Sequence, residues 1–223
     1  MSKGSPAVQD YLKAIYLEAE SHGSMTHLVA TTAIANRLDV SAASATNMVK
    51  KLASLRLVRH SRYKGVRLTT AGRKVALEVV RHHRLLETYL AEALGVPWDA
   101  VHDEAEVLEH VLSEDLEERI ARHLGHPVTD PHGHPIPSRD LELPELGGQP
   151  LWGAVEDVRL RVQRVPDWEP EVLRYLGSIG IRPGVSLSVV RRGPQGGPLF
   201  VAIESEEIET ALSKEMAETI WVA

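Results

Sequence analysis

The chain has 223 residues, a formal net charge of −6 at pH 7 and no cysteine. This length suffices for one large or two to three small domains with cores of their own. The lack of cysteine excludes disulfides, thiolate nucleophiles and cysteine zinc fingers. The N-terminus has no apolar signal segment, and no stretch reaches the ~18 apolar residues of a membrane span, so we expect a cytoplasmic protein that does not enter a membrane.

The charge is distributed unevenly along the chain. Residues 1–75 contain 12 Lys and Arg against 4 Asp and Glu, whereas the remaining residues contain 13 against 27. Residues 50–74 contain nine basic residues and no acidic one. Such a run would also fit a solvated face, but its density favours a surface that contacts phosphates.

The N-terminal segment has the pattern of one helix followed by a helix-turn-helix. A Ser-Pro start at Ser5 and apolar residues at helical spacing predict a helix that ends near Gly23. Thr31 or Thr32 caps a short helix, and after a turn Ser41 caps the next one. The side chains of this next helix that we expect to point inward are Met48, Val49, Leu52 and Leu55.

A β-hairpin follows the helix-turn-helix. Residues 59–68 alternate around Lys64-Gly65, which is a hairpin signal. A helix-turn-helix joined to a hairpin is a winged helix, and we therefore predict a winged helix-turn-helix DNA-binding domain over residues 1–73.

In a winged helix, the outward side chains near the start of the second helix meet the bases in the major groove. Here these residues are Ala43, Ser44, Thr46, Asn47 and Lys50. Asn47 can pair bidentately with adenine, and Ala43 can contact a thymine methyl group. Ser41 is a further candidate, although helix capping explains it equally well. The residues that we expect on phosphates, which position the protein without reading sequence, are Lys51, Arg62 and Lys64.

Residues 102–110 are the most informative stretch. On a single helix, four polar side chains fall within an arc of about 100° beside an apolar stripe. They are His102, Glu106, Glu109 and His110. Two imidazoles and two carboxylates at a core edge are costly to bury unless a partner such as a divalent metal satisfies them. One helix earlier, His83 and Glu87 repeat the i, i+4 spacing, whereas we expect the neighbouring His82 at the surface.

Three helices form the middle of the chain. A long helix opens at residues 69–72 and ends near Ala93, Pro97 starts the helix with the candidate ligands, and Ser113 starts a third that ends near Leu124. Their apolar content exceeds what so small a segment can bury on itself. We therefore predict a helical dimerisation and metal-binding domain over residues 74–140, and a homodimer suits a helix-turn-helix that reads two half-sites.

The composition changes after the last of these helices. Proline and glycine residues predict a linker over residues 141–150, and we expect the His-Gly-His sequence at residues 132–134 to be structural. Short alternating segments and a helix at residues 169–179 predict a small, mostly β domain over residues 151–223, with a five-stranded SH3-like barrel. The predicted fold class is therefore α+β.

The chain resembles the diphtheria toxin repressor family of metal-dependent transcription regulators, which includes iron- and manganese-responsive members. The resemblance covers nearly the whole chain. Its most specific parts are Arg84-Leu85 after His83, the run Val-His-Asp-Glu-Ala at residues 101–105 that leads to Glu109-His110, and the loop Gly-His-Pro-Ile-Pro at residues 133–137. It implies a winged helix, a helical dimerisation and metal domain, and an SH3-like (FeoA-like) third domain.

The resemblance also implies two metal sites in each subunit. The first would consist of Asp10, Glu106, Glu109 and His110. The second would consist of His83, Glu87 and His102, to which the third domain can add Asp167 or Glu169. Asp10 and Glu106 stand where iron-responsive members have Met and Cys, and this exchange of sulfur for oxygen favours Mn²⁺, with Fe²⁺ as the alternative. Manganese-transport regulators have Glu where this chain has Lys13, so we do not expect their two-metal cluster to form here in the same way.

We therefore expect a metal-activated, dimeric repressor of manganese or iron uptake genes that binds an inverted-repeat operator. It would have no enzymatic activity and no small organic substrate. Two other classes are the alternatives. A metallohydrolase would need an open coordination position and a general base in a pocket. A winged-helix regulator that senses an organic ligand would not need two helices with metal-ligand spacing.

Overall fold

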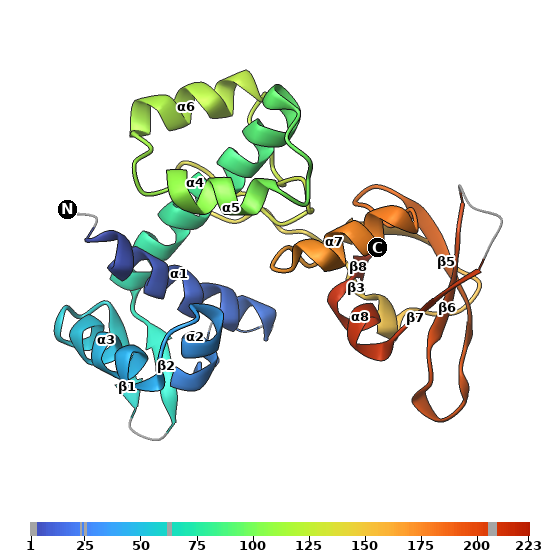
Figure 1. Ribbon diagram of the computed structural model, residues 1–223, viewed down its shortest axis with the longest axis horizontal. Helices are drawn as coiled ribbons and strands as arrows, with labels where there is room; N and C mark the ends of the chain where they lie inside the picture. Colours follow the sequence, from blue (N-terminus) through green and yellow to red (C-terminus); the bar gives the residue numbers. More distant parts are fainter. Residues whose placement is uncertain (1–3, 23, 25, 62–63, 205–208) are drawn as a thin grey trace. The chain divides into compact units, whose positions relative to one another are not determined.

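The computed structural model describes residues 4–22, 24, 26–61, 64–204 and 209–223 (Figure 1). The chain divides into two compact units. The first comprises Met1–His82, Glu109–Leu112 and Pro137–Glu142, and the second comprises His83–Leu108, Ser113–Ile136 and Leu143–Ala223. Within the described residues, no helix has the length and apolar character that crossing a membrane requires.

The first unit contains a winged helix-turn-helix (Figure 1). Its helices are α1 (Pro6–Ser21), α2 (Thr31–Arg37) and α3 (Ala42–Ser54). Its wing is an antiparallel pair of strands, β1 (Val58–Ser61) and β2 (Gly65–Leu68). The core of this domain consists of buried apolar side chains that include Leu12, Ile15, Ile34, Val49, Leu52 and Val66. Helices and wing follow in the predicted order.

Two helix ends in this domain differ from the sequence expectations. Ala30 and not a threonine precedes α2, and Thr31 is its first residue. Leu55 is the C-terminal cap of α3 and is 51% exposed, because it lies beyond the last turn that packs on the core. The predicted cap of α3 is present, since the Ser41 hydroxyl accepts a hydrogen bond from Ser44 N at 3.1 Å.

Three helices follow the wing: α4 (Thr70–Leu94), α5 (Val101–Leu108) and α6 (Glu114–His123). The second of these begins later than Pro97, because Ala100 N donates to Pro97 O at 2.8 Å and closes a turn there. It also ends at Leu108, so the prediction of one helix through residues 102–110 is wrong. Glu109 and His110 lie in the turn that follows. His82, which is buried rather than exposed, contacts the Glu109 carbonyl oxygen through Nδ1 at 3.0 Å and supplies that oxygen with a side-chain partner.

The third domain lies in the second unit and is built on a six-stranded antiparallel sheet. The strand order is β3-β8-β4-β5-β6-β7. The strands are β3 (Gln149–Pro150), β4 (Arg159–Arg164), β5 (Ser186–Arg192), β6 (Leu199–Ile203), β7 (Glu209–Leu212) and β8 (Trp221–Val222). The helices are α7 (Pro170–Ser178) and α8 (Lys214–Thr219), with single 3₁₀ turns η1 (Leu151–Gly153) and η2 (Pro194–Gly196). The sequence expectation was five strands, and two-residue strands such as β3 and β8 are too short to show a period of two.

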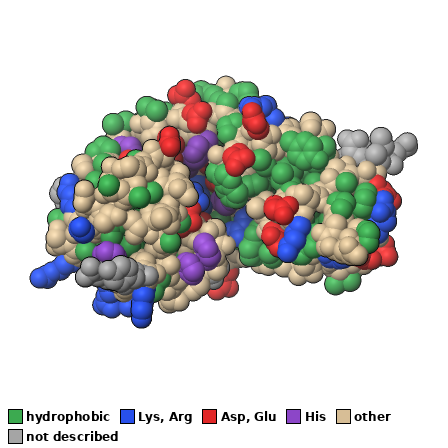
Figure 2. All heavy atoms as spheres, turned by 60° about the horizontal axis from the view of Figure 1, so that its bottom comes forward, with side chains coloured by type: hydrophobic (Ala, Val, Ile, Leu, Met, Phe, Trp, Pro, Cys, Tyr) green, Lys and Arg blue, Asp and Glu red, His purple; other side chains and the backbone are tan. Residues whose placement is uncertain are grey.

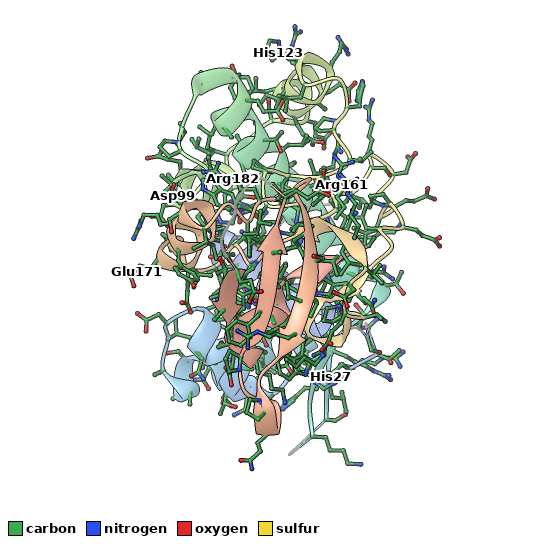
Figure 3. All side chains as sticks on the ribbon, turned by 90° about the vertical axis from the view of Figure 1, so that its right-hand side faces the viewer. His27, Asp99, His123, Arg161, Glu171 and Arg182 are labelled. Atoms are coloured by element: carbon green, nitrogen blue, oxygen red, sulfur yellow. The ribbon has the colours of Figure 1, made fainter. Side chains whose placement is uncertain are left out.

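The third domain contacts the turn that precedes α5. The Arg182 guanidinium lies 4.7 Å from the centroid of the Trp98 ring, and Arg174 Nη1 lies 3.4 Å from Asp99 Oδ2. Figure 3 labels Arg182 and Asp99, one residue from each of these two contacts. In addition, Val165 N donates a hydrogen bond to the His132 carbonyl at 2.9 Å. This last contact places the loop before residue 137 against the end of β4.

Candidate metal centre

The first group of candidate ligands lies in the first unit. Asp10 is on α1, and Glu109 and His110 are in the turn after α5. His110 Nε2 is 2.8 Å from Asp10 Oδ1 and 3.7 Å from Glu109 Oε1. One ligand atom from each residue lies within 4.8 Å of the other two. Atoms that are each ~2.0–2.2 Å from one ion have separations in this range, so the group fits a single divalent cation.

Gln9 determines which nitrogen of His110 faces this group. Gln9 Oε1 is 2.6 Å from His110 Nδ1. Because an amide oxygen only accepts, Nδ1 carries a proton, and in the metal-binding, neutral form of the ring the lone pair is on Nε2, toward Asp10. A ring N–H held by an outer partner is typical of metal-binding histidines. Sequence reasoning missed Gln9, and the available signal was a polar residue beside Asp10 on the edge of the α1 stripe.

The first group also contains a cation of the protein itself. Lys13 Nζ lies 2.7 Å from Glu109 Oε2, and both side chains are buried. The other oxygen, Glu109 Oε1, is the one on the side of His110. The Glu109 carboxylate therefore joins an ammonium group on one side to the candidate ligands on the other.

The second group lies in the second unit and brings together three of the predicted ligands. His83 Nε2 is 3.0 Å from Glu87 Oε1 and 3.1 Å from His102 Nδ1, and His102 Nδ1 is 3.3 Å from Glu87 Oε1. Two imidazole nitrogens and one carboxylate oxygen thus meet at a single point between α4 and α5. This donor set is suited to a divalent cation.

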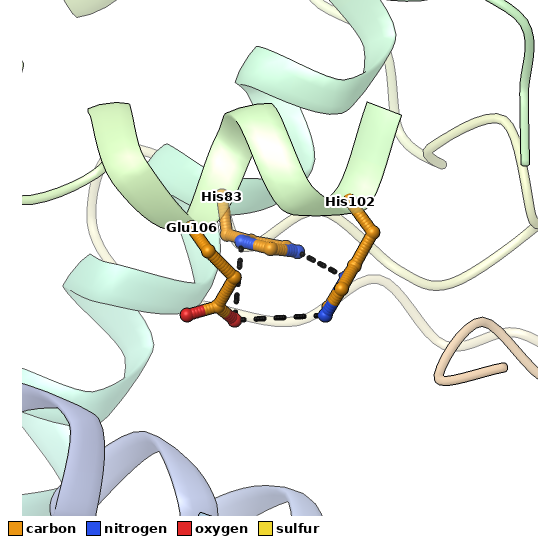
Figure 4. A group of neighbouring side chains, drawn as sticks. All are labelled: His83, His102 and Glu106. Carbon is orange, nitrogen blue, oxygen red and sulfur yellow. Dashed lines mark hydrogen bonds and ion pairs between the residues drawn. The ribbon is translucent and has the colours of Figure 1, made fainter. Parts of the chain in front are cut away.

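Glu106 lies with the histidines of this second group (Figure 4). Its Oε1 is 3.7 Å from His102 Nε2 and 3.9 Å from His83 Nδ1. These are the ring nitrogens that do not face Glu87. Glu106 follows His102 by one helical turn, which accounts for their proximity. The resemblance implied Glu106 in the first set, and that assignment stays a prediction.

Glu87 is charged although it is fully buried. Burial raises the pKa of this carboxyl group. The charge of His83, the hydrogen bonds from His102 and His83 and the charge of His132 outweigh burial, and the pKa lies well below the usual carboxyl value. The surrounding imidazoles therefore keep the buried Glu87 carboxylate ionised.

The two candidate ligands of the third domain occupy different positions. Asp167 Oδ2 is 3.5 Å from His134 Nδ1, in the loop that ends at residue 136. Glu169 is the N-terminal cap of α7, is exposed, and makes no side-chain capping bond.

The candidate DNA-binding residues lie on α3 and at the wing. Six of them are exposed in addition to the cap Ser41, namely Ala43, Ser44, Asn47, Lys50, Lys51 and Lys64. Thr46 is half-buried, and its hydroxyl donates to Ala42 O at 2.7 Å. Arg62 lies outside the described residues. Figure 2 shows Lys and Arg side chains gathered at the lower left, where the winged helix lies.

Three family models match successive parts of the chain. Residues 5–66 match the iron-dependent repressor N-terminal DNA-binding domain. Residues 69–138 match the iron-dependent repressor metal-binding and dimerisation domain, and residues 150–223 match the FeoA domain. The matches follow one another in the order of the winged helix, the helices with the candidate ligands, and the six-stranded sheet.

Individual relatives match over nearly the full chain. The iron-dependent repressor IdeR of Mycobacterium tuberculosis is 34% identical over 228 residues, covering 95% of this chain and 94% of that protein. The diphtheria toxin repressor of Corynebacterium diphtheriae is 37% identical over 226 residues, with the same coverage of 95% and 94%. A solved manganese-dependent transcriptional repressor in complex with manganese is 42% identical, with a TM-score of 0.89 over 97% of this chain and 99% of that one. The chain therefore belongs to the iron-dependent repressor family, and it is a metal-dependent transcriptional repressor and not an enzyme.

Proposed function

We propose that the protein is a repressor activated by Mn²⁺, with Fe²⁺ as the alternative ion, and that it binds an inverted-repeat operator as a homodimer. The observation that carries the choice of ion is the first group, in which two carboxylates and one imidazole come together and sulfur takes no part. Carboxylate oxygens suit Mn²⁺, whereas thiolate and thioether ligands select softer ions. The solved manganese-bound relative supports the same choice.

Each subunit would hold two ions. Asp10, Glu109 and His110 would bind the first, to which the family resemblance adds Glu106. The second would lie among His83, Glu87 and His102. The contacts of Glu106 involve the other ring nitrogens, His102 Nε2 and His83 Nδ1, so they do not bring it to the point that Glu87 shares with the two rings. A bound ion supplies the positive charge that lets these acidic and imidazole groups share one centre.

The first group couples metal binding to the DNA-binding domain. Asp10 belongs to α1, whose inner face packs in the core of the winged helix. Without a bound cation, the carboxylates of Asp10 and Glu109 repel each other, so α1 is held less firmly to the segment 109–112. Firmer attachment would fix the spacing of the two recognition helices α3 in the dimer. A tenfold difference in DNA affinity requires only about 1.4 kcal/mol of coupling between the two sites.

Exposed apolar side chains support the homodimer. Leu94 on α4, Val107 on α5 and Leu116 on α6 are 61%, 72% and 49% exposed. Exposed apolar residues on three consecutive helices are suited to a subunit interface. A twofold dimer presents two copies of α3 in twofold-related positions, and the matching operator is an inverted repeat.

Capture of genomic DNA fragments tests this proposal. The purified protein is incubated with genomic fragments in the presence of Mn²⁺, of Fe²⁺ without oxygen, or of a chelator. We expect fragments with an inverted repeat to be recovered with Mn²⁺ and to be lost with the chelator. Recovery that the chelator does not change would overturn metal activation, and better recovery with Fe²⁺ would overturn the choice of ion.

A variant then connects the response to the first group. Asp10→Ala should remain a folded dimer and lose the metal-dependent gain in DNA binding. Asp103→Ala, which removes an exposed carboxylate from α5, is the matched control and should respond to metal as the parent does. A full metal response in Asp10→Ala would contradict the proposed ligand set.

A further inference from the structure

A third group of polar side chains lies in the second unit, where the loop of residues 126–136 meets the third domain. Its members are Asp130, His134 and Asp167. His134 Nδ1 is 3.7 Å from Asp130 Oδ2 and 3.5 Å from Asp167 Oδ2, and the three atoms lie within 4.8 Å of one another. Both distances exceed those of an N–H···O hydrogen bond, which are ~2.7–3.2 Å.

The backbone of the loop builds this arrangement. Asp130 Oδ1 accepts hydrogen bonds from His132 N and His134 N, both at 2.9 Å, and this turns Oδ2 toward the His134 ring. Gly133 lies between the two histidines with a φ of +89°, and a Cβ atom there would come within 1.9 Å of Gln163 O. Only glycine permits this close approach of the turn to β4. The positions of the ligand atoms are therefore set by the turn and by the third domain together.

Two atoms of the group are buried polar atoms that face its centre. Asp130 Oδ2 and His134 Nδ1 make no hydrogen bond with any described residue, and Asp130 is only 5% exposed. Arg84 Nε is 3.7 Å from Asp130 Oδ2, too far for a hydrogen bond, while its Nη1 donates to Pro135 O at 2.7 Å. Buried polar atoms of this kind are rare because desolvation is costly, and an ion is one of their explanations.

A second pair of facing polar atoms adjoins the group. His132 Nε2 is 2.7 Å from the Trp98 carbonyl, which only accepts, so Nε2 carries a proton. His132 Nδ1 lies 3.9 Å from Glu87 Oε2. Neither of these two atoms has a hydrogen-bond partner in the described part of the chain. Burial lowers the pKa of His132, but the charges of Glu87, Asp130 and Asp167 raise it above the usual value.

We propose that Asp130, His134 and Asp167 form a third cation site, which takes a divalent ion of the Mn²⁺, Fe²⁺ or Zn²⁺ class. Ligand atoms ~2.0–2.2 Å from one ion in tetrahedral geometry are about 3.5 Å apart, close to the two observed separations. A doubly protonated His134 is the competing explanation. Its single Nδ1 proton would point to one carboxylate and form a short hydrogen bond, whereas Nδ1 is nearly equidistant from both. The site shares no ligand with the two groups of the proposed function and does not depend on them.

Such a site would give the third domain a role in metal binding. Asp167 belongs to the third domain, whereas Asp130 and His134 belong to the loop after α6. An ion bound by all three would fasten this loop to the third domain, and the attachment would respond to the concentration of metal.

Metal stoichiometry tests the proposal on the full-length protein. Bound Mn²⁺ per chain is measured by equilibrium dialysis and elemental analysis for the parent and His134→Asn. We expect the variant to bind about one ion fewer than the parent, with metal-dependent DNA binding retained. His126→Asn changes an exposed histidine of the same loop and should bind as many ions as the parent. Equal stoichiometry in all three proteins would overturn the site. Loss of the metal response in the parent would instead overturn only the proposed function.

A second measurement avoids any effect of the substitutions on folding. Crystals of the unaltered protein are soaked with Mn²⁺, and anomalous scattering is measured at the manganese edge. We expect a peak among Asp130 Oδ2, His134 Nδ1 and Asp167 Oδ2. Peaks at the first two groups with none at this position would overturn the third site.

Discussion

The ammonium group of Lys13 lies 2.7 Å from a carboxylate oxygen of Glu109, and both side chains are buried. This pair brings a permanent positive charge to the edge of the group formed by Asp10, Glu109 and His110. With Lys13 in place, the two carboxylates retain one net negative charge, which suits one divalent cation better than two. The charge of Lys13 therefore favours a single ion in the first group.

Replacement of Lys13 should lower the stability of the protein more without metal than with it. Lys13→Met leaves Glu109 buried without its ammonium partner, and breaking a buried pair in this way costs about 3–5 kcal/mol. We expect this loss of stability in chelator and a smaller loss at saturating Mn²⁺, because the bound ion stabilises the folded state and offsets the carboxylate charge. Denaturation followed by circular dichroism measures both. Lys50→Met, at an exposed position, is the control, and equal losses with and without metal would argue against a role of Glu109 as a ligand.

Gln9 should affect metal affinity through His110. Gln9→Leu removes the acceptor that holds the Nδ1 proton, so the ring is free to turn or change tautomer. We expect metal affinity at the first group to fall about 10–100-fold, which is the usual effect of losing such an outer partner. Gln9→Glu keeps an acceptor and should retain most of the affinity. Calorimetric titration with Mn²⁺ distinguishes the two, and equal affinities in both variants would show that Gln9 does not orient the ring.

Two exposed residues of α3 should contribute differently to DNA binding. Asn47→Ala should cost about 1–3 kcal/mol on the specific site and relax the preference at one base pair, because a bidentate contact to a base is lost. Lys51→Ala should weaken specific and non-specific binding alike and reduce the salt dependence by about one ion. Fluorescence anisotropy across a salt series measures both effects. A sequence-dependent loss in Lys51→Ala would assign it to a base and not to a phosphate.

Gly133 should tolerate no side chain. Gly133→Ala forces a Cβ atom against Gln163 O at a positive φ. We expect the free energy of unfolding to fall by more than about 3 kcal/mol, in the range of severe steric mutations. Gly125→Ala is the matched control, since Gly125 also has a positive φ, +72°, but no atom lies within 4 Å of its added Cβ. The control should lose only the ~1–2 kcal/mol of the left-handed conformation. Denaturation followed by tryptophan fluorescence compares them, and similar losses would show that the turn can move away from β4.

Patterns within short stretches were sufficient to predict much of the architecture. The Ser41 cap, the alternation around Lys64-Gly65 and the change of composition after α6 predicted the winged helix, the helical segment and the third domain, and the family comparisons agree with this fold. Helix periods and turn signals depend on neighbouring residues, so they can be recognised in the sequence without knowledge of tertiary contacts. Short strands were the exception, because β3 and β8 have only two residues each.

The sequence by itself thus determined the fold class and the residue types available for metal binding, whereas the tertiary structure decided which of them meet. Spacing on an assumed helix placed His102, Glu106, Glu109 and His110 in one arc, but α5 ends at Leu108. Glu106 lies beside His83 and His102, and His110 lies beside Asp10 and Glu109. Gln9 meets His110, and the loop histidine His134 meets Asp167, through segments that are distant in the chain. Ligand geometry depends on the packing of such segments, and a period along the chain carries no information about it.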